Sequence, residues 1–320
     1  EGAMNALKRY WWLILLAAIA VYPVIGKPSP YRSGLLIFAG IYIILAVGLD
    51  LLMGYTGQIS VGHAAFFAVG AYTSGILTAK YGFSPAAAMG VGVVFSATLA
   101  FLTGRPVLAL KEYYLAMATL AFNEIVVTLI IGFEGLTGGA SGLRDIPPFT
   151  IFGFSLLNHL HYYYFVWTVV VLVIASSIAV VRSPFGRALI AIHSDEQAAR
   201  SFGVDCAKYK TRAYMLAAVY ASIAGSLFAH YMGFIAPDDF GILTSINLLV
   251  MLFLGGIGTI FGPALGALFL KLLPEITYQF QDYELLINGI ILIVVLVFFP
   301  KGLFGIFTAL KNKIVPRMDK

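Results

Sequence analysis

One short run of the sequence combines glycine with hydrogen-bonding side chains. Between residues 54 and 63, glycines alternate with small polar residues in an otherwise apolar stretch. Glycine lets backbones approach closely and lets a helix be interrupted, and backbone groups freed in this way need hydrogen-bond partners. The run therefore predicts a site that hydrogen-bonds irregular backbone or a polar solute. Its candidate residues are Gly54, Thr56, Gly57, Gln58, Ser60 and His63.

A second glycine-rich stretch lies in the C-terminal third of the chain. It contains Gly255, Gly256 and Gly258, followed by Gly262 and Gly266. The spacing of four from Gly258 onward favours close packing of helices. The stretch follows no strand and has the wrong glycine spacing for a dinucleotide-binding loop.

Glu124 is an isolated carboxylate near the middle of an apolar segment. A buried carboxylate there is costly and marks a functional candidate, with a hydrogen-bonded packing group as the alternative. We find no Ser-His-Asp arrangement, carboxylate pair or zinc-like spacing, and His63 and His230 are interpreted as packing or hydrogen-bonding groups. The single Cys206 excludes an internal disulfide. The sequence also lacks the Gly-x-x-x-x-Gly-Lys-Ser/Thr phosphate loop, so it binds no ATP through that motif.

The composition indicates the class of fold that positions these residues. Hydrophobic residues make up 60% of the chain and charged residues 11%, with a mean hydropathy of +0.92. In soluble domains, hydrophobic residues make up about 45–50% and charged residues about 25%. Because a bilayer span takes about 20 residues, the chain is predicted to be an all-α integral membrane protein, with residues 1–320 forming a single transmembrane domain. A soluble enzyme, a disordered chain and a disulfide-stapled secreted chain are excluded.

Apolar segments separated by polar residues or by Gly and Pro predict about ten transmembrane or partly crossing helices. The first follows Lys8 and Arg9 and is interpreted as a retained signal-anchor helix. The region 242–273 is either one broken helix or two crossing helices. The segments are 11–26, 34–53, 62–79, 85–104, 113–133, 162–181, 212–232, 242–257, 260–273 and 285–300.

The distribution of Lys and Arg predicts the orientation. If the N-terminus is cytoplasmic and all ten segments cross, fifteen of the 20 Lys and Arg residues lie inside. This asymmetry follows the positive-inside rule and places the C-terminus in the cytoplasm as well. The five basic residues left outside are Lys27, Arg32, Lys80, Arg144 and Lys271.

Two connections are longer than ordinary loops. Residues 134–161 form an extracytoplasmic loop rich in Gly and Pro, followed by an aromatic cluster at 162–167 that predicts an interfacial belt. Residues 182–212 form a cytoplasmic loop, in which Asp195 or Ser194 can cap a helix of about two turns that starts at Glu196 and stops at Gly203. Such a helix suits docking into a cleft of another protein, and a solvated linker is the alternative.

This loop resembles the coupling loop of ABC importer permeases. It carries Glu-x-Ala-Ala-x-x-x-Gly, and the preceding Ser-Pro-Phe-Gly-Arg-Ala segment is similar to the branched-chain amino-acid permease family. The run at 48–67 resembles that family's signature, with Asp50 where many members carry Asn, and the run at 255–267 resembles its late glycine-rich motif. The resemblance extends over residues 40–300, with the three motifs in the family's order. The loop residues that match are Ser183, Pro184, Gly186, Arg187, Glu196, Ala198, Ala199 and Gly203.

The resemblance implies a multi-pass permease subunit of the bacterial inner membrane that is not itself an enzyme. It implies that the chain binds no cofactor, and that ATP and Mg²⁺ bind to two separate ATPase subunits. A second paralogous permease subunit and an extracytoplasmic solute-binding protein complete the expected complex, with membrane lipid around it and no nucleic acid. The two glycine-rich runs, with Glu124, are candidates to border the translocation path.

Alternatives remain at this point. Within the same class, the solute is a branched-chain or another amino acid, urea, a short amide or another small solute, and the permease pair is a heterodimer or a homodimer. A different class is a proton-coupled secondary transporter that uses Glu124 as its proton carrier. A membrane enzyme would need a polar catalytic cluster that the sequence lacks.

Overall fold

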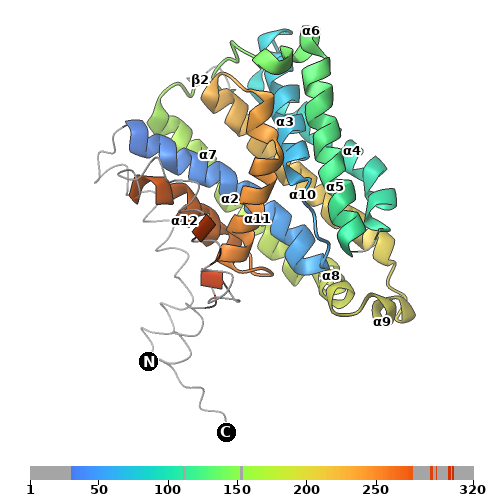
Figure 1. The fold of residues 1–320 in the computed structure, drawn as a ribbon. Coiled ribbons are helices and arrows are strands. Elements are labelled where there is room, and N and C mark those ends of the chain that lie inside the picture. Colours follow the sequence, from blue (N-terminus) through green and yellow to red (C-terminus); the bar gives the residue numbers. More distant parts are fainter. Residues whose placement is uncertain are drawn as a thin grey trace, which may run out of the picture.

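The computed structural model describes residues 30–110, 112–151 and 154–276, together with residues 289, 290, 293, 302, 303 and 305. Its long helices form a bundle (Figure 1). One small hairpin pairs β1 (Thr150–Ile151) with β2 (Phe154–Ser155). The long helices are α2 (Pro30–Thr56), α3 (His63–Ala79), α4 (Pro85–Leu108), α5 (Glu112–Gly132), α7 (His159–Arg182), α10 (Cys206–Met232), α11 (Ile242–Gly255) and α12 (Phe261–Ile276).

Five short elements lie between them. Two follow α5 in the long connection, two occupy the connection between α7 and α10, and one precedes α11. Figure 1 places α8 and α9 at one end of the bundle, here called the α9 end, and α6 at the opposite end. The short elements are α6 (Glu134–Thr137), η1 (Gly139–Ser141), α8 (Pro184–Ser194), α9 (Glu196–Ser201) and η2 (Pro237–Phe240).

The helices match the predicted segments from 34–53 to 260–273 one for one. Within the described residues, six stretches are long and apolar enough to cross a membrane, and a shorter apolar helix covers Phe261–Leu273. The predicted segment 11–26 lies outside the described residues, as does nearly all of 285–300, so the total of about ten spans stays a prediction. The six stretches are Tyr31–Thr56, Pro85–Leu108, Tyr113–Gly132, His159–Arg182, Cys206–Met232 and Pro237–Gly255.

Contacts between helices fix their relative directions. Gly34 of α2 lies against Tyr231 of α10, whereas Gly48 lies against Tyr220, so α2 and α10 are antiparallel. Corresponding contacts make α4 and α7 antiparallel to α10 and α3 parallel to it. Neighbours in the sequence therefore run in opposite directions, as expected of a chain that crosses a bilayer repeatedly.

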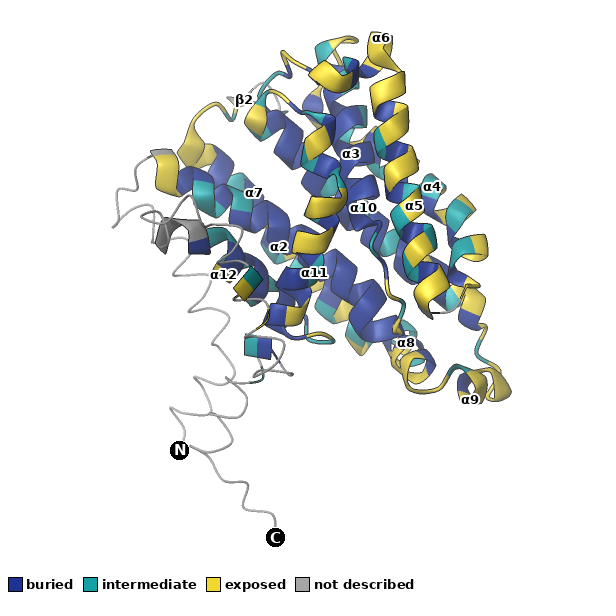
Figure 2. Cartoon of the chain, viewed as in Figure 1, coloured by how far each residue is buried: buried dark blue, intermediate teal, exposed yellow. Residues whose placement is uncertain are grey.

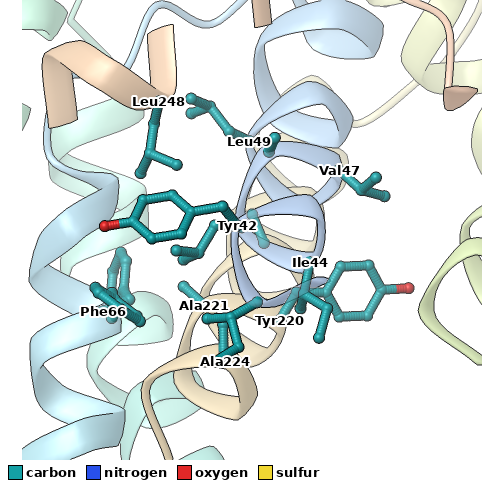
Figure 3. Close-up of a cluster of buried hydrophobic side chains, with 14 of the residues drawn as sticks. Tyr42, Ile44, Val47, Leu49, Phe66, Tyr220, Ala221, Ala224 and Leu248 are labelled. Atoms are coloured by element: carbon teal, nitrogen blue, oxygen red, sulfur yellow. The ribbon is translucent and has the colours of Figure 1, made fainter. Parts of the chain in front are cut away.

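The core is formed by α2, α3 and α10, which are buried along most of their length, whereas α4 and α5 expose their outer faces (Figure 2). Gly225 of α10 meets the backbone of α3 at Phe67, so these two helices touch without intervening side chains. Figure 3 shows Tyr42 and Tyr220 directed to opposite sides of α2, with Leu248 of α11 above Tyr42. Small residues bring the backbones together, and large aromatic and aliphatic side chains fill the remaining space.

The region 242–273 forms two separate helices rather than one broken helix. Residues 256–260 join them, and Gly256 and Gly258 adopt positive φ angles of 112° and 74° in this turn. Gly258 is therefore a turn residue, and it also packs closely against Gly54 of α2. Gly262 and Gly266 do pack against the backbone of α11. From this turn α12 returns along α2, where the Lys271 amine lies 3.6 Å from the centre of the Tyr42 ring.

The aromatic cluster at the start of α7 packs inside the protein. Tyr162, Tyr163 and Trp167 are buried, and the Tyr162 hydroxyl donates to the carbonyl of Leu227 at 2.6 Å. The predicted interfacial belt is wrong for these three residues, because this face of α7 packs against α2, where Trp167 lies against Gly40, and against Leu227 of α10. Hydrophobicity alone does not distinguish a side chain buried inside the protein from one at the membrane interface.

Candidate functional site

The short helix α9 forms where the sequence predicts it. The Asp195 carboxylate caps it, accepting hydrogen bonds from the amides of Gln197 at 2.8 Å and Ala198 at 3.0 Å. This decides between the two predicted caps in favour of Asp195. Gly203 has a φ of +83° and its amide donates to the carbonyl of Arg200, so it ends the helix as predicted.

An ion pair fastens α9 to the start of α10. The Glu196 carboxylate accepts from Arg200 at 2.6 Å and from Lys210 at 2.5 Å, and the side chain of Lys210 is only 6% exposed. Burial by itself raises the pKa of Glu196. The hydrogen bonds and positive charges of Lys210 and Arg200 outweigh it, so the pKa lies below the ordinary 4.5. Glu196 is therefore ionised at neutral pH and holds α9 in place.

Helix α8, which precedes α9, is an element that the sequence reading missed. Ser183 accepts a hydrogen bond from the amide of Gly186 as the N-cap, and Pro184 takes the first position. Leu189 and Ile192 form its buried face. The Ser-Pro start and the apolar spacing of three are the signals that could have identified it.

The other loop residues that match the permease family lie partly in the interior and partly on the surface. Gly186 packs against the backbone of Val181, and Ala199 is buried. Arg187 is exposed and donates to the carbonyl of Arg182. The motif thus contributes both to internal packing and to the outer surface.

A small apolar cluster holds α8, α9 and the start of α10 together. Ile192, Ala199 and Cys206 are each buried to 4% exposure or less, and Val204 and Tyr209 pack against them. The Cys206 thiol is thus a packing group. We call residues 183–210 the coupling unit, after the coupling loop that the sequence predicts there. They form one packed body, and a loose solvated linker does not describe them.

The outer face of the coupling unit has no partner within the described residues. Gln197, Ala198 and Ser201 are exposed, and the side chain of Phe202 is 88% exposed. A large aromatic side chain on a small rigid projection is a typical anchor for a protein–protein contact. The geometry of this face supports docking.

The coupling unit contacts the membrane helices through His193. Its Nδ1 lies 2.9 Å from the carbonyl oxygen of Gly54 near the end of α2. One turn earlier, the Asp50 carboxylate accepts a hydrogen bond from the amide of Gly258 at 2.8 Å. Gly54 also touches Gly258. The structure thus brings the two predicted glycine runs together, and an Asn at position 50 would retain the accepting oxygen.

The other residues of the first run face the protein interior or the α9 end. Thr56 donates to the carbonyl of Leu52, and Gln58 donates to the carbonyl of Thr56. Ser60 and His63 are buried, and Gly57 is exposed beside His193. Gly255 and Gly256 lie at the turn between α11 and α12. These positions describe packing and a turn, and a role in the translocation path stays a prediction.

Glu124 is exposed on α5, which corrects the expectation of a buried carboxylate. Its neighbour Asn123 is the buried polar residue, and its amide nitrogen donates to the carbonyl of Phe240 at 3.3 Å. Glu124 therefore lies on the outer face of α5, whereas Thr119 of the same helix contacts the first glycine run at Val61 and Gly62. Among the described residues no group of three metal-ligating side chains forms a metal site.

His230 lies in a hydrogen-bonded cluster between α10 and α3. Its Nε2 is 2.8 Å from the Ser74 hydroxyl, which also accepts from Ser226, and its Nδ1 is 2.7 Å from the carbonyl of Pro147. The interpretation of His230 as a hydrogen-bonding group is confirmed.

Comparison with known proteins fits this arrangement of spans and coupling unit. The family described as "Branched-chain amino acid transport system / permease component" matches residues 31–296. The chain belongs to this family. The permease protein LivM of the high-affinity branched-chain amino acid transport system of Escherichia coli K12 is 34% identical over 93% of this chain and 76% of its own length. The LivM of Salmonella typhimurium LT2 is also 34% identical, over 95% of this chain and 76% of its own length.

A more distant relative is the autoinducer 2 import system permease protein LsrC of Yersinia enterocolitica. It is 26% identical over 89% of this chain and 81% of its own length. No solved structure matches the chain. Membership of the permease family makes the protein a permease subunit of an ABC importer in the inner membrane, whose partners include ATPases and a binding protein and whose ATP hydrolysis takes place on other subunits.

Proposed function

We propose that this subunit passes a branched-chain or closely related amino acid through a pathway formed with a second, paralogous permease subunit. The two LivM relatives, at 34% identity, are named as permeases for branched-chain amino acids. The LsrC relative is named for a different solute. A permease for another small solute, such as urea or a short amide, is therefore the second candidate.

The distribution of charge supports a cytoplasmic location of the α9 end. Seven of the eleven described Lys and Arg residues lie at this end and three at the other, with Lys271 between them. By the positive-inside rule the basic end faces the cytoplasm. With ten spans, both termini lie there too. The seven are Arg105, Arg182, Arg187, Arg200, Lys208, Lys210 and Arg212, and the three are Arg32, Lys80 and Arg144.

The coupling unit gives the main support for this proposal. In our proposal its exposed face, with Phe202, docks into one of two ATPase subunits. These subunits bind ATP and Mg²⁺, and this chain binds no cofactor. Movement of the docked unit reaches α2 through the contact of His193 with Gly54, and reaches the turn between α11 and α12 through Gly258. The solute then passes when these helices shift.

The exposed face of α5 supports a pathway between two permease subunits. Glu124 lies on this face inside a predicted span, and a carboxylate there is too costly to contact lipid tails. We therefore place the second permease subunit, or the aqueous path between the two, against this face. The solute-binding protein delivers the solute at the end opposite α9.

Co-purification from native membranes tests the assembly. We expect two ATPase subunits and a second permease chain to accompany the protein, and ATP-dependent uptake of radiolabelled L-leucine after reconstitution with the binding protein. Competition by unlabelled isoleucine and valine, with none by urea or acetamide, would separate the two candidate solute classes. A solitary protein whose uptake follows a proton gradient and is abolished by Glu124→Gln would overturn the proposal in favour of a secondary transporter.

A further inference from the structure

A second polar region lies part-way along the bundle, where η2 meets the first turn of α11. Phe240 of η2 packs against Phe67 and Tyr72 of α3, with ring centres 5.0 Å and 5.7 Å apart. The other end of α11 lies at the turn that contacts Gly54 near the α9 end. Helix α11 itself therefore begins part-way along the bundle and runs toward the α9 end over 14 residues, about half the 27 residues of α2.

The amino end of α11 carries no side-chain cap. Gly241 precedes the helix and has no side chain to accept from its first amides. Ile242 and Leu243, which supply those amides, are 38% and 68% exposed. The amino end of a helix bears partial positive charge, and half-helices that begin within a membrane bind carboxylate groups of substrates in this way.

Three residues that contact Phe240 or belong to the first turn of α11 carry buried polar atoms without partners. Ser245, in the first turn of α11, is 2% exposed, and its hydroxyl has no hydrogen-bond partner. Asn123 is 1% exposed and holds the Phe240 carbonyl through its amide nitrogen, while its side-chain oxygen has no partner. The buried hydroxyl of Tyr72 also has none. Buried polar groups are normally paired, so three unpaired ones around one helix end indicate that a ligand completes them.

Acidic side chains lie beside this helix end. Asp238 is exposed, and Asp239 is half-buried, accepting from the amide of Ala236 at 2.9 Å. Glu124 follows Asn123 directly and is exposed. Residues 233–270 contain no Lys or Arg. The region therefore offers amide donors for an anion and carboxylates for a cation within one short stretch.

We propose that η2 and the first turn of α11 bind the zwitterionic head group of a small amino acid during its passage. The free amides of α11 and the Ser245 hydroxyl donate to the α-carboxylate. Asp238 and the side-chain oxygen of Asn123 accept from the α-ammonium group. The exposed side chains of Leu243 and Ile246 contact an aliphatic side chain. This inference rests on the proposed function, because it assigns the solute site of the same pathway.

The test measures binding to the purified importer complex by saturation-transfer NMR with L-leucine as the probe, without ATP. Ser245→Ala and Asn123→Leu are expected to weaken binding about tenfold each, as when a hydrogen bond to a charged group is removed. Ser222→Ala is the matched control, since Ser222 is an equally buried serine with an unpaired hydroxyl on α10. It should change the affinity less than about twofold.

Two leucine analogues test the recognition of both charges. 4-Methylpentanoate lacks the ammonium group and 3-methylbutylamine lacks the carboxylate, so each should compete at least about tenfold more weakly than leucine. Size-exclusion profiles and melting temperatures confirm that the variants are folded, and Tyr72→Phe serves as a third site variant should either of the first two unfold. Absence of saturable binding to the wild type, unchanged affinity in the folded site variants, or equal competition by a singly charged analogue would each overturn the inference.

The same preparation separates this inference from the proposed function. If uptake depends on ATP but the site variants bind leucine as the wild type does, the proposed site is wrong and the importer function stands. If the site variants weaken leucine binding as expected but uptake does not depend on ATP, the proposed function is wrong and the site stands.

Discussion

The coupling unit and the amino end of α11 are both polar, but they differ in whether their polar groups have hydrogen-bond partners within the protein. In the coupling unit Asp195, Glu196, Lys210 and His193 all have hydrogen-bond partners within the protein. At the amino end of α11, Asn123, Ser245 and Tyr72 each have a buried polar atom without one. Paired groups hold a fixed shape and so can transmit a displacement. Unpaired groups leave hydrogen-bonding capacity for a solute.

The largest effect is expected for Glu196→Lys. The change leaves the buried amine of Lys210 without its counter-charge and adds a second cation beside it. Removing the counter-charge of a buried cation costs about 2 kcal/mol or more, which corresponds to about a thirtyfold shift in the docked population. Uptake per ATP hydrolysed should fall accordingly, while the amount of protein in the membrane stays normal.

The control for this change is Glu134→Lys, the same substitution on an exposed residue of α6 at the opposite end. It should leave coupling unchanged. Wild-type uptake in Glu196→Lys would remove the assignment of α9 as the coupling helix.

Phe202→Ala should have the next largest effect. Truncation of an aromatic anchor in an interface costs about 2 kcal/mol, so the affinity for the ATPase subunits should fall by more than about tenfold. Binding of the ATPases to the reconstituted permease pair measures this. Phe83→Ala is the matched control, because Phe83 is 49% exposed in the connection between α3 and α4, at the other end. Equal ATPase affinity in both variants would show that Phe202 is not part of the interface.

His193→Ala should have a smaller effect that is specific to transmission. It removes the contact with the Gly54 carbonyl, about 1 kcal/mol for one hydrogen bond, and leaves the outer face of α9 intact. ATPase affinity should stay at the wild-type value while uptake per ATP falls about two- to fivefold. A parallel loss of both would indicate instead that His193 stabilises the coupling unit as a whole.

The pH dependence of the Glu196 ion pairs should be the smallest effect in the working range. The pKa of Glu196 is lowered in the folded protein, below its ordinary 4.5. Its stabilisation of α9 is therefore complete above the unfolded pKa and is lost only as the pH falls through the folded one. Hydrogen exchange of the α9 amides, corrected for intrinsic rates, should show constant protection between about pH 6 and 8. A transition with a midpoint above about pH 5 would contradict this assignment.

Much of the fold follows from the sequence, because a bilayer leaves few choices. Apolar length predicted the eight described long helices, and Asp195, Glu196 and Gly203 predicted α9 through its cap, its acidic start and its glycine stop. Helix α8 was missed because it is short and its start lies directly after a long span. The burial of Tyr162 and the exposure of Glu124 depend on which neighbour covers each helix face, and periodicity does not contain that information.

The site near α11 was out of reach for a similar reason. Asn123 and Ser245 lie more than a hundred residues apart, and each is an ordinary polar residue in its own helix. Only the half-length of α11 brings them to one place. The contact between Gly54 and Gly258 was likewise not predictable, although both runs were recognised as unusual.

The direct backbone contact between α3 and α10 has a consequence for motion during import. With no side chain between the two helices at Gly225, neither can tilt or slide against the other without a collision or a void. The pair should therefore keep one geometry through the whole cycle, and spin labels on α3 and α10 should report a single, unchanging distance. Changes of distance should be confined to helices that meet this pair through side chains, which makes α3 and α10 the natural reference frame for measuring the transport cycle.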